Sequence, residues 1–206
     1  MITPFVNFCR DNRAASAAEF ALVLPLLLIF LLGTLDVGRL MWTWNRAEKA
    51  TQMGVRYAVV TDIVAGGLGS YSFAVDGGVP QGDVVDTDIF GSMTCNLTDD
   101  CTCTGSGCDA AWTLDSDTFA ELVARMQAFL PEIEPENVEV EYTNVGLGYS
   151  GDPNGPDVAP LVTVRFREDQ PITFTPITLI LFDTTITLPS FSAALTLEDG
   201  QGSQSN

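Results

Sequence analysis

The first third of the chain consists of one apolar run followed by a helical repeat. Residues 20–35 are sixteen positions without a charge, and the small residues 14–18 extend the run towards the N-terminus. A helix needs about 20 apolar residues to span a bilayer. Beyond the run, apolar or small residues recur at spacings of three and four: Val37, Leu40, Met41, Trp44, Ala47, Thr51 and Val55. The pattern predicts one helix over residues 15–60, with its first half in lipid.

A second helix is predicted over residues 116–131. Ser116 or Asp117 is expected to cap its N-terminus, and Pro131 is expected to close it. Its apolar positions fall on one face: Phe119, Leu122, Val123, Met126, Phe129 and Leu130.

The rest of the acidic half is predicted to form short strands and loops. Strict alternation predicts a strand over residues 138–143, and β-branched residues predict another over 161–167. Further strands are expected in three apolar segments, residues 171–174, 177–182 and 186–198. The glycine-rich stretch 65–83 is expected to be a loop. Together these elements predict an α+β protein, in which a long N-terminal helix precedes a head with one helix on a small antiparallel sheet.

The formal net charge of −18 is distributed unevenly. Residues 1–60 hold six basic and four acidic groups, whereas the remainder holds three basic and 23 acidic groups. Such an acidic head repels phosphate backbones, so nucleic-acid binding is not expected. The chain contains no histidine, which excludes His-dependent catalysis and His-ligated metal sites.

Four cysteines lie within fourteen residues: Cys95, Cys101, Cys103 and Cys108. Their spacing, C-x5-C-x-C-x4-C, lacks the paired C-x2-C units of zinc sites. In an oxidising compartment two disulfides are the default, and on that ground they are expected rather than a metal cluster, with three connectivities open. The fifth cysteine, Cys9, precedes the apolar run.

No catalytic or cofactor site is predicted. Two acidic groups invite a calcium interpretation: Asp83, Asp86 and Asp88, and Asp152, Asn154 and Asp157. Neither has the glycine and terminal glutamate of an EF-hand loop, so both are expected to be solvated loop acids. The sequence GGLGS at residues 66–70 lacks the lysine of a phosphate-binding loop.

The N-terminal block resembles a known family. Small residues precede EFALVLPLLL, the motif DVGR follows at residues 36–39, and the helical pattern ends in GVRYA at residues 54–58. In these features residues 13–60 resemble TadE-like proteins, the minor pseudopilins of tight-adherence (Flp) pili. Residues 160–199 also resemble the β-rich end of that family.

The resemblance implies a processed leader and a register-setting glutamate. Prepilin peptidase would cut between Ala14 and Ala15, which makes Glu19 the fifth residue of the mature chain. Such leaders usually end in glycine, whereas residue 14 is alanine. Glu19 would pair with the free amine of a neighbouring subunit and fix the axial stagger. Phe20 and the apolar residues after it would anchor and pack, and Pro25 would bend the helix.

The implied organisation is a leader (1–14), a transmembrane and stem helix (15–60), a periplasmic head (61–198) and a disordered tail (199–206). The protein would cross the bacterial inner membrane once and join a surface pilus. Its partners would be other pilin and minor pseudopilin subunits, prepilin peptidase and inner-membrane lipid. Basic residues flanking the apolar run, two before and three after, do not assign its orientation. The alternative is a membrane-tethered binding module, an adhesin or calcium-binding head, in which Glu19 only marks the membrane boundary.

Overall fold

The computed structural model describes residues 15–108, 112–179, 184–198 and Gly200. The chain divides into two compact units. The first comprises residues 1–42 and 174–186, and the second comprises residues 43–173 and 187–206.

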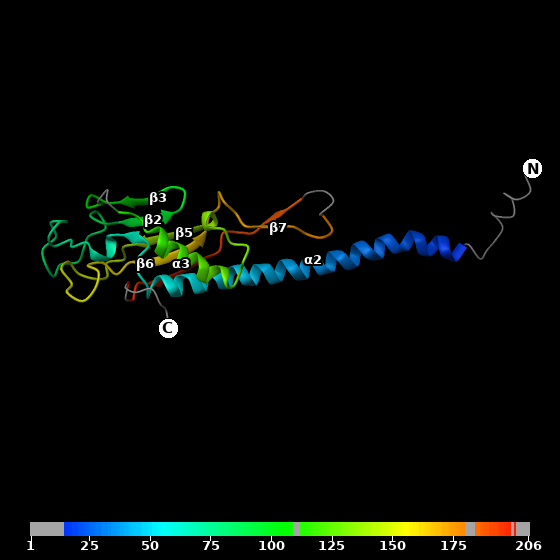
Figure 1. The fold of residues 1–206 in the computed structure, drawn as a ribbon, viewed down its shortest axis with the longest axis horizontal. Helices are drawn as coiled ribbons and strands as arrows, with labels where there is room; N and C mark the ends of the chain where they lie inside the picture. Colours follow the sequence, from blue (N-terminus) through cyan, green and yellow to red (C-terminus); the bar gives the residue numbers. More distant parts are fainter. Residues whose placement is uncertain (1–14, 109–111, 180–183, 199, 201–206) are drawn as a thin grey trace, which may run out of the picture. The chain divides into compact units, whose positions relative to one another are not determined.

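The predicted N-terminal helix is α2, Ala15–Ala58, with Pro25 inside it (Figure 1). Every described side chain from residue 17 to residue 31 is exposed, although most of them are apolar. Among the described residues, α2 is the helix that is both long enough and apolar enough to cross a membrane. This agrees with the prediction of a membrane-spanning first half.

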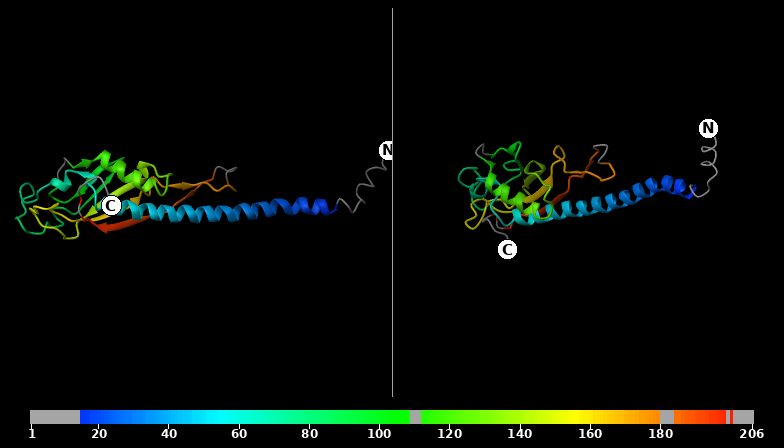
Figure 2. Two further views of the ribbon diagram at one scale, coloured as in Figure 1. Left: turned by 60° about the horizontal axis from the view of Figure 1, so that its bottom comes forward. Right: turned by 45° about the vertical axis from the view of Figure 1, so that its right-hand side comes forward.

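The head combines one helix with an antiparallel sheet, which confirms the predicted α+β class. The sheet has the strand order β3-β2-β5-β6-β9, and each neighbouring pair is antiparallel (Figures 1 and 2). Its strands are β2 (Ser92–Asn96), β3 (Asp100–Thr104), β5 (Val138–Thr143), β6 (Leu161–Phe166) and β9 (Ser192–Thr196).

Smaller elements flank this sheet. Two two-stranded ladders pair β1 (Ala65–Gly66) with β4 (Thr113–Leu114), and β7 (Thr173–Phe174) with β8 (Ile186–Thr187). The helical elements are α3 (Ser116–Gln127) and the short 3-10 helices η1 (Leu68–Ser70) and η2 (Pro135–Asn137).

The core lies between one face of the sheet and two helices. Alternate residues of the central strands point into it: Val138, Val140, Tyr142, Val162, Val164 and Phe166. The predicted apolar face of α3 is buried there as well. Gly54 of α2 contacts this core, since a Cβ placed on it would lie 2.9 Å from Met126 and 3.3 Å from Val164. The second part of α2 and α3 therefore share one face of the sheet.

The opposite face of the sheet is polar. Glu139 stands opposite Arg165 in the β5–β6 register, and the Arg165 guanidinium forms ion pairs with Glu139 and Glu141. These hydrogen bonds to the carboxylates raise the pKa of Arg165 against the opposing effect of desolvation.

Helix α3 differs from its prediction at both ends. Asp115, not Ser116 or Asp117, is the N-cap, and its carboxylate accepts the amides of Asp117 at 3.1 Å and Thr118 at 3.0 Å. At the other end the helix stops at Gln127, before Pro131. The amide of Leu130 bonds back to Met126, in a turn that buries the Leu130 side chain in the core.

Other short elements were predicted wrongly or missed. Residues 177–179 form a turn rather than the start of a strand, and residues 180–182 lie outside the described residues. Strands β2 and β3 occupy the cysteine-rich segment, where no strand was predicted. The glycine-rich stretch contains β1 and η1 in addition to loops. The tail 199–206 is described only at Gly200.

The buried stripe of α2 also departs from the prediction. Ala47, Thr51 and Val55 are buried as expected, whereas Val37 and Met41 are 61% and 49% exposed. The buried residue at that level is Asp36. An apolar-periodicity argument assigns a charged residue to the solvent side, and Asp36 is the exception because it has its own hydrogen-bonding partners.

Candidate functional site

The first candidate region is the apolar half of α2. Glu19 is exposed at the start of this helix, and the Phe20 ring beside it is 61% exposed. Pro25 lies within the helix, as predicted. Ala15 begins α2, whereas Ala14 lies outside the described residues. An all-round apolar helix without cover requires lipid or other helices around it.

The second candidate region is the Asp36 cluster, formed by Asp36, Arg39, Ile177 and Thr178. One oxygen of the Asp36 carboxylate accepts the Ile177 amide at 2.7 Å. The other accepts both the amide and the hydroxyl of Thr178, at 2.8 and 2.7 Å. The Asp36 side chain is therefore tied to a segment about 140 residues later in the sequence.

Arg39 completes the cluster from one turn further along α2. Its Nη1 lies 3.2 Å from Asp36 Oδ1, and its guanidinium carbon lies 5.1 Å from the centre of the Phe174 ring. Asp36 is only 6% exposed, and a buried charge is tolerated when its lone pairs are satisfied. Of the two charged residues of the DVGR motif, Asp36 thus contacts the turn after β7, and Arg39 contacts Phe174, the last residue of β7. The sequence identified the motif but gave no sign of this partner.

The four clustered cysteines form two disulfides. Cys95 and Cys101 face each other across β2 and β3, with their Cα atoms 4.1 Å apart. Cys103 is joined to Cys108, with Cα atoms 5.9 Å apart. The structure thereby selects one of the three connectivities that the sequence left open. Both bridges join residues close in sequence. The first links β2 to β3, and the second links β3 to the loop that follows it.

A buried arginine holds the end of β6 to the β2–β3 turn. Arg167, 7% exposed, donates to Asn96 at 2.7 Å and to Asp99 at 3.2 Å. It also donates to Asp169 at 2.6 Å. The hydrogen bond from Arg167 lowers the pKa of Asp169, and the same bond raises the pKa of Arg167.

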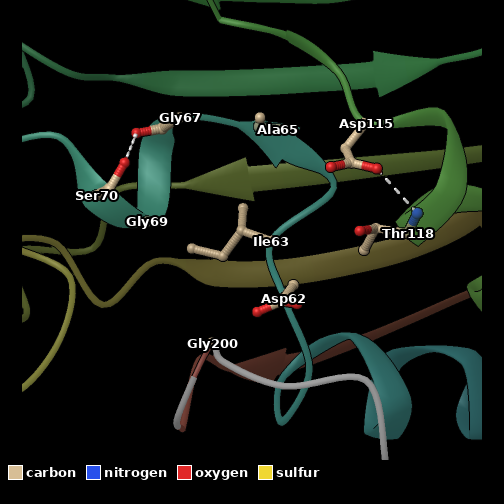
Figure 3. Close-up of a pocket in the computed structure, with 10 residues that line it drawn as sticks. Asp62, Ile63, Ala65, Gly67, Gly69, Ser70, Asp115, Thr118 and Gly200 are labelled. Atoms are coloured by element: carbon tan, nitrogen blue, oxygen red, sulfur yellow. Dashed lines mark hydrogen bonds between the residues drawn. The ribbon is translucent and has the colours of Figure 1, made fainter.

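A cavity of about 350 Å³ lies beside the glycine-rich stretch of the head (Figure 3). Its lining includes Asp62 and Asp115 together with Gly67 and Ser70. One oxygen of Asp115 caps α3, and the Ser70 hydroxyl donates to the Gly67 carbonyl at 3.3 Å. The two carboxylates in the wall would repel a phosphate group.

The two acidic groups considered for calcium are used to hold loops. Asp157 accepts the Phe73 amide at 2.6 Å and the Asp152 amide at 3.1 Å. Asp86 accepts the Asp88 amide at 3.0 Å. Across the described ranges, three or more His, Cys, Asp or Glu side chains do not come together as a metal site.

The comparison with protein families concerns the N-terminal segment. Residues 14–56 match the family described as TadE-like protein. The matched segment contains Glu19, Pro25 and the DVGR motif, so the predicted resemblance is confirmed there. No curated protein and no solved structure matches the chain.

The match covers most of the N-terminal helix and none of the head. It ends at residue 56, within α2, so it does not reach the segment after β7 that binds the DVGR motif. The predicted resemblance of residues 160–199 stays a prediction.

Proposed function

We propose that this chain is a minor pseudopilin that takes part in assembling a tight-adherence pilus through its N-terminal helix. The observation that carries the proposal is the TadE-like match over residues 14–56, on a helix whose apolar half is uncovered. In this proposal the helix anchors the protein in the inner membrane, and the acidic, disulfide-bonded head lies in the periplasm. An oxidising compartment suits the two disulfides of the head.

In this proposal Glu19 sets the axial stagger between neighbouring helices. A carboxylate at the centre of a bilayer costs roughly 2.5–3.5 kcal/mol on insertion scales. Removal of residues 1–14 by prepilin peptidase creates a free amine at Ala15, and the amine of a neighbouring subunit neutralises Glu19. Helices then pack side by side in one axial stagger. Exposed apolar residues from Phe20 onwards form the packing surface, and Pro25 adjusts its direction.

The mature N-terminus tests the processing step. The membrane-extracted protein is analysed by intact mass and by mapping of its N-terminal peptide. A chain that begins at Ala15 supports the proposal, because Glu19 is then its fifth residue. A chain that begins at Met1 contradicts processing and favours a membrane-tethered binding module.

The glutamate is tested separately. Glu19→Gln removes the charge that the neighbouring amine requires, so we expect loss of co-purification with pilin and other minor pseudopilin subunits, while the chain remains in the membrane. Glu48→Gln is the matched control, because Glu48 is an exposed acid further along the same helix. Equal co-purification of both variants with the native chain would contradict the role of Glu19.

A further inference from the structure

Residues 174–179, which begin with the last residue of β7, are held at one level of α2. Ile177 and Thr178 bond to Asp36 through their backbone amides, and Phe174 lies against Arg39. Since backbone atoms make two of these bonds, the position of the segment along the helix is fixed within ångströms. All these residues belong to the same compact unit.

Asp36 is the first charged residue after the sixteen uncharged positions of residues 20–35. A helix that spans the bilayer with this run places Asp36 at the border between hydrocarbon and headgroups. The segment bonded to Asp36 must lie at the same depth. This conclusion is independent of which side of the membrane the head occupies.

The chemistry of the segment suits that depth. Residues 174–179, with the sequence FTPITL, contain no charge, and the Ile177 side chain is 43% exposed. On α2 an apolar hollow lies next to the Asp36 level, lined by Phe30, Leu31, Thr34 and Leu35. Trp42, 69% exposed, provides an aromatic side chain of the kind enriched at membrane interfaces.

We infer that residues 174–179 form a second membrane contact, which rests in the lipid interface beside α2 and is positioned by the DVGR motif. Residues 174–179 contact lipid at the level of the glycerol backbone and the upper acyl chains. This lipid is continuous with the lipid around residues 20–35. Contact at two points fixes the depth and the rotation of α2, which a single helix leaves free. The inference rests on the membrane location of α2 in the proposed function.

Lipid photo-crosslinking of the full chain tests it. The protein is reconstituted in vesicles of phosphatidylethanolamine and phosphatidylglycerol that contain a lipid with a diazirine high on its acyl chain. After irradiation, lipid-modified peptides are mapped by mass spectrometry. We expect label on residues 20–35 and on residues 174–179, and none on strand β5. Label on residues 20–35 alone would overturn the inference and leave the anchor intact, whereas label on neither segment would overturn the anchor as well.

Two variants make the test specific. Ile177→Asp keeps the amide that bonds to Asp36 but places a charge in the interface, so label on residues 174–179 should fall about tenfold relative to label on α2. Val75→Asp is the matched control, since Val75 is a 79% exposed apolar residue in the head, and it should change neither label. Undiminished label on the segment in Ile177→Asp would contradict the lipid contact. The α2 label and the native disulfide map report that each variant is folded.

Discussion

Gly54 of α2 lies directly against Met126 of α3. A Cβ on Gly54 would come within 2.9 Å of both Cγ and Sδ of Met126, and within 3.3 Å of Val164 on β6. Two helices and a strand meet here because one residue lacks a side chain. This contact explains why the motif GVRYA contains a glycine in the interior of a helix, where glycine costs about 1 kcal/mol relative to alanine.

Gly54→Val should destabilise the head. Three added carbon atoms meet a packed site, and such overpacking costs typically about 1–3 kcal/mol. Thermal unfolding of the full chain in detergent, followed by tryptophan fluorescence, should show a lower midpoint. Gly38→Val is the control, because a Cβ on Gly38 meets nothing within 4 Å, and its midpoint should stay near that of the native protein. Equal midpoints for the two variants would contradict the packing.

Asp36→Asn should release the segment after β7. The substitution removes the charge and puts an NH2 group where a carboxylate oxygen accepts an amide, and hydrogen bonds to charged groups contribute about 1.5–3 kcal/mol. Hydrogen–deuterium exchange in detergent should therefore accelerate at least about tenfold at the amides of Ile177 and Thr178.

Glu48→Gln, on the exposed side of the same helix, should leave this exchange unchanged. Exchange that is also unchanged in Asp36→Asn would mean that other contacts hold the segment in place. The two outcomes are distinguishable without any pilus partner.

Elements with a strong period could be predicted from the sequence. Helix α3 and strand β5 follow from the spacing of their apolar residues, and strand β6 follows from its β-branched residues, since each buries one face in the core of the head. Helix α2 follows from its uncharged run and from the spacing of three and four beyond it. Strands β2 and β3 could not be predicted from the sequence. Alternating Thr and Cys residues, as at Thr102–Cys103, differ too little in polarity to give a clear pattern. Their strand character comes from the pairing of β2 with β5 on one side and with β3 on the other, and from the Cys95–Cys101 bridge between β2 and β3.

The candidate site was predictable in part for a similar reason. Glu19 and Pro25 stand out as a charge and a helix breaker in an apolar run. From the sequence, Asp36 and Arg39 look like ordinary charged residues at a membrane boundary. The partners of Asp36 could not be foreseen, because Ile177 and Thr178 are remote in sequence and bind it through backbone amides. A bond from a backbone amide leaves no residue-type signature that could be recognised in advance.

Non-reducing peptide mapping should find the pairs Cys95–Cys101 and Cys103–Cys108. Each closes a short loop, for which chain-entropy arguments give about 2–3 kcal/mol of stability. Replacing Cys95 and Cys101 together by alanine should lower the unfolding midpoint more than replacing Cys103 and Cys108, because Cys95 is fully buried, whereas Cys103 and Cys108 are both only partly buried. Any peptide that links Cys101 to Cys108 or Cys95 to Cys103 would contradict this pairing.

The link between Arg167 and Asp169 should contribute to stability only above acidic pH. The hydrogen bond from Arg167 lowers the pKa of Asp169 in the folded protein below its ordinary value of 3.8. A group with a lowered folded pKa stabilises the fold above its unfolded pKa, and the contribution is lost as the pH falls through the folded value.

Unfolding midpoints measured from pH 7 down to pH 2 should therefore fall less steeply in Asp169→Asn than in the native chain. At pH 7 the variant should be the less stable of the two, and the difference should shrink as the pH decreases below about 4. The effect should be small, because Asp169 is largely exposed and its charge is screened by solvent. Asp76→Asn, a substitution at an exposed loop acid, should retain the native slope. A difference between Asp169→Asn and the native chain that stays constant from pH 7 to pH 2 would contradict the ionic contribution of Asp169.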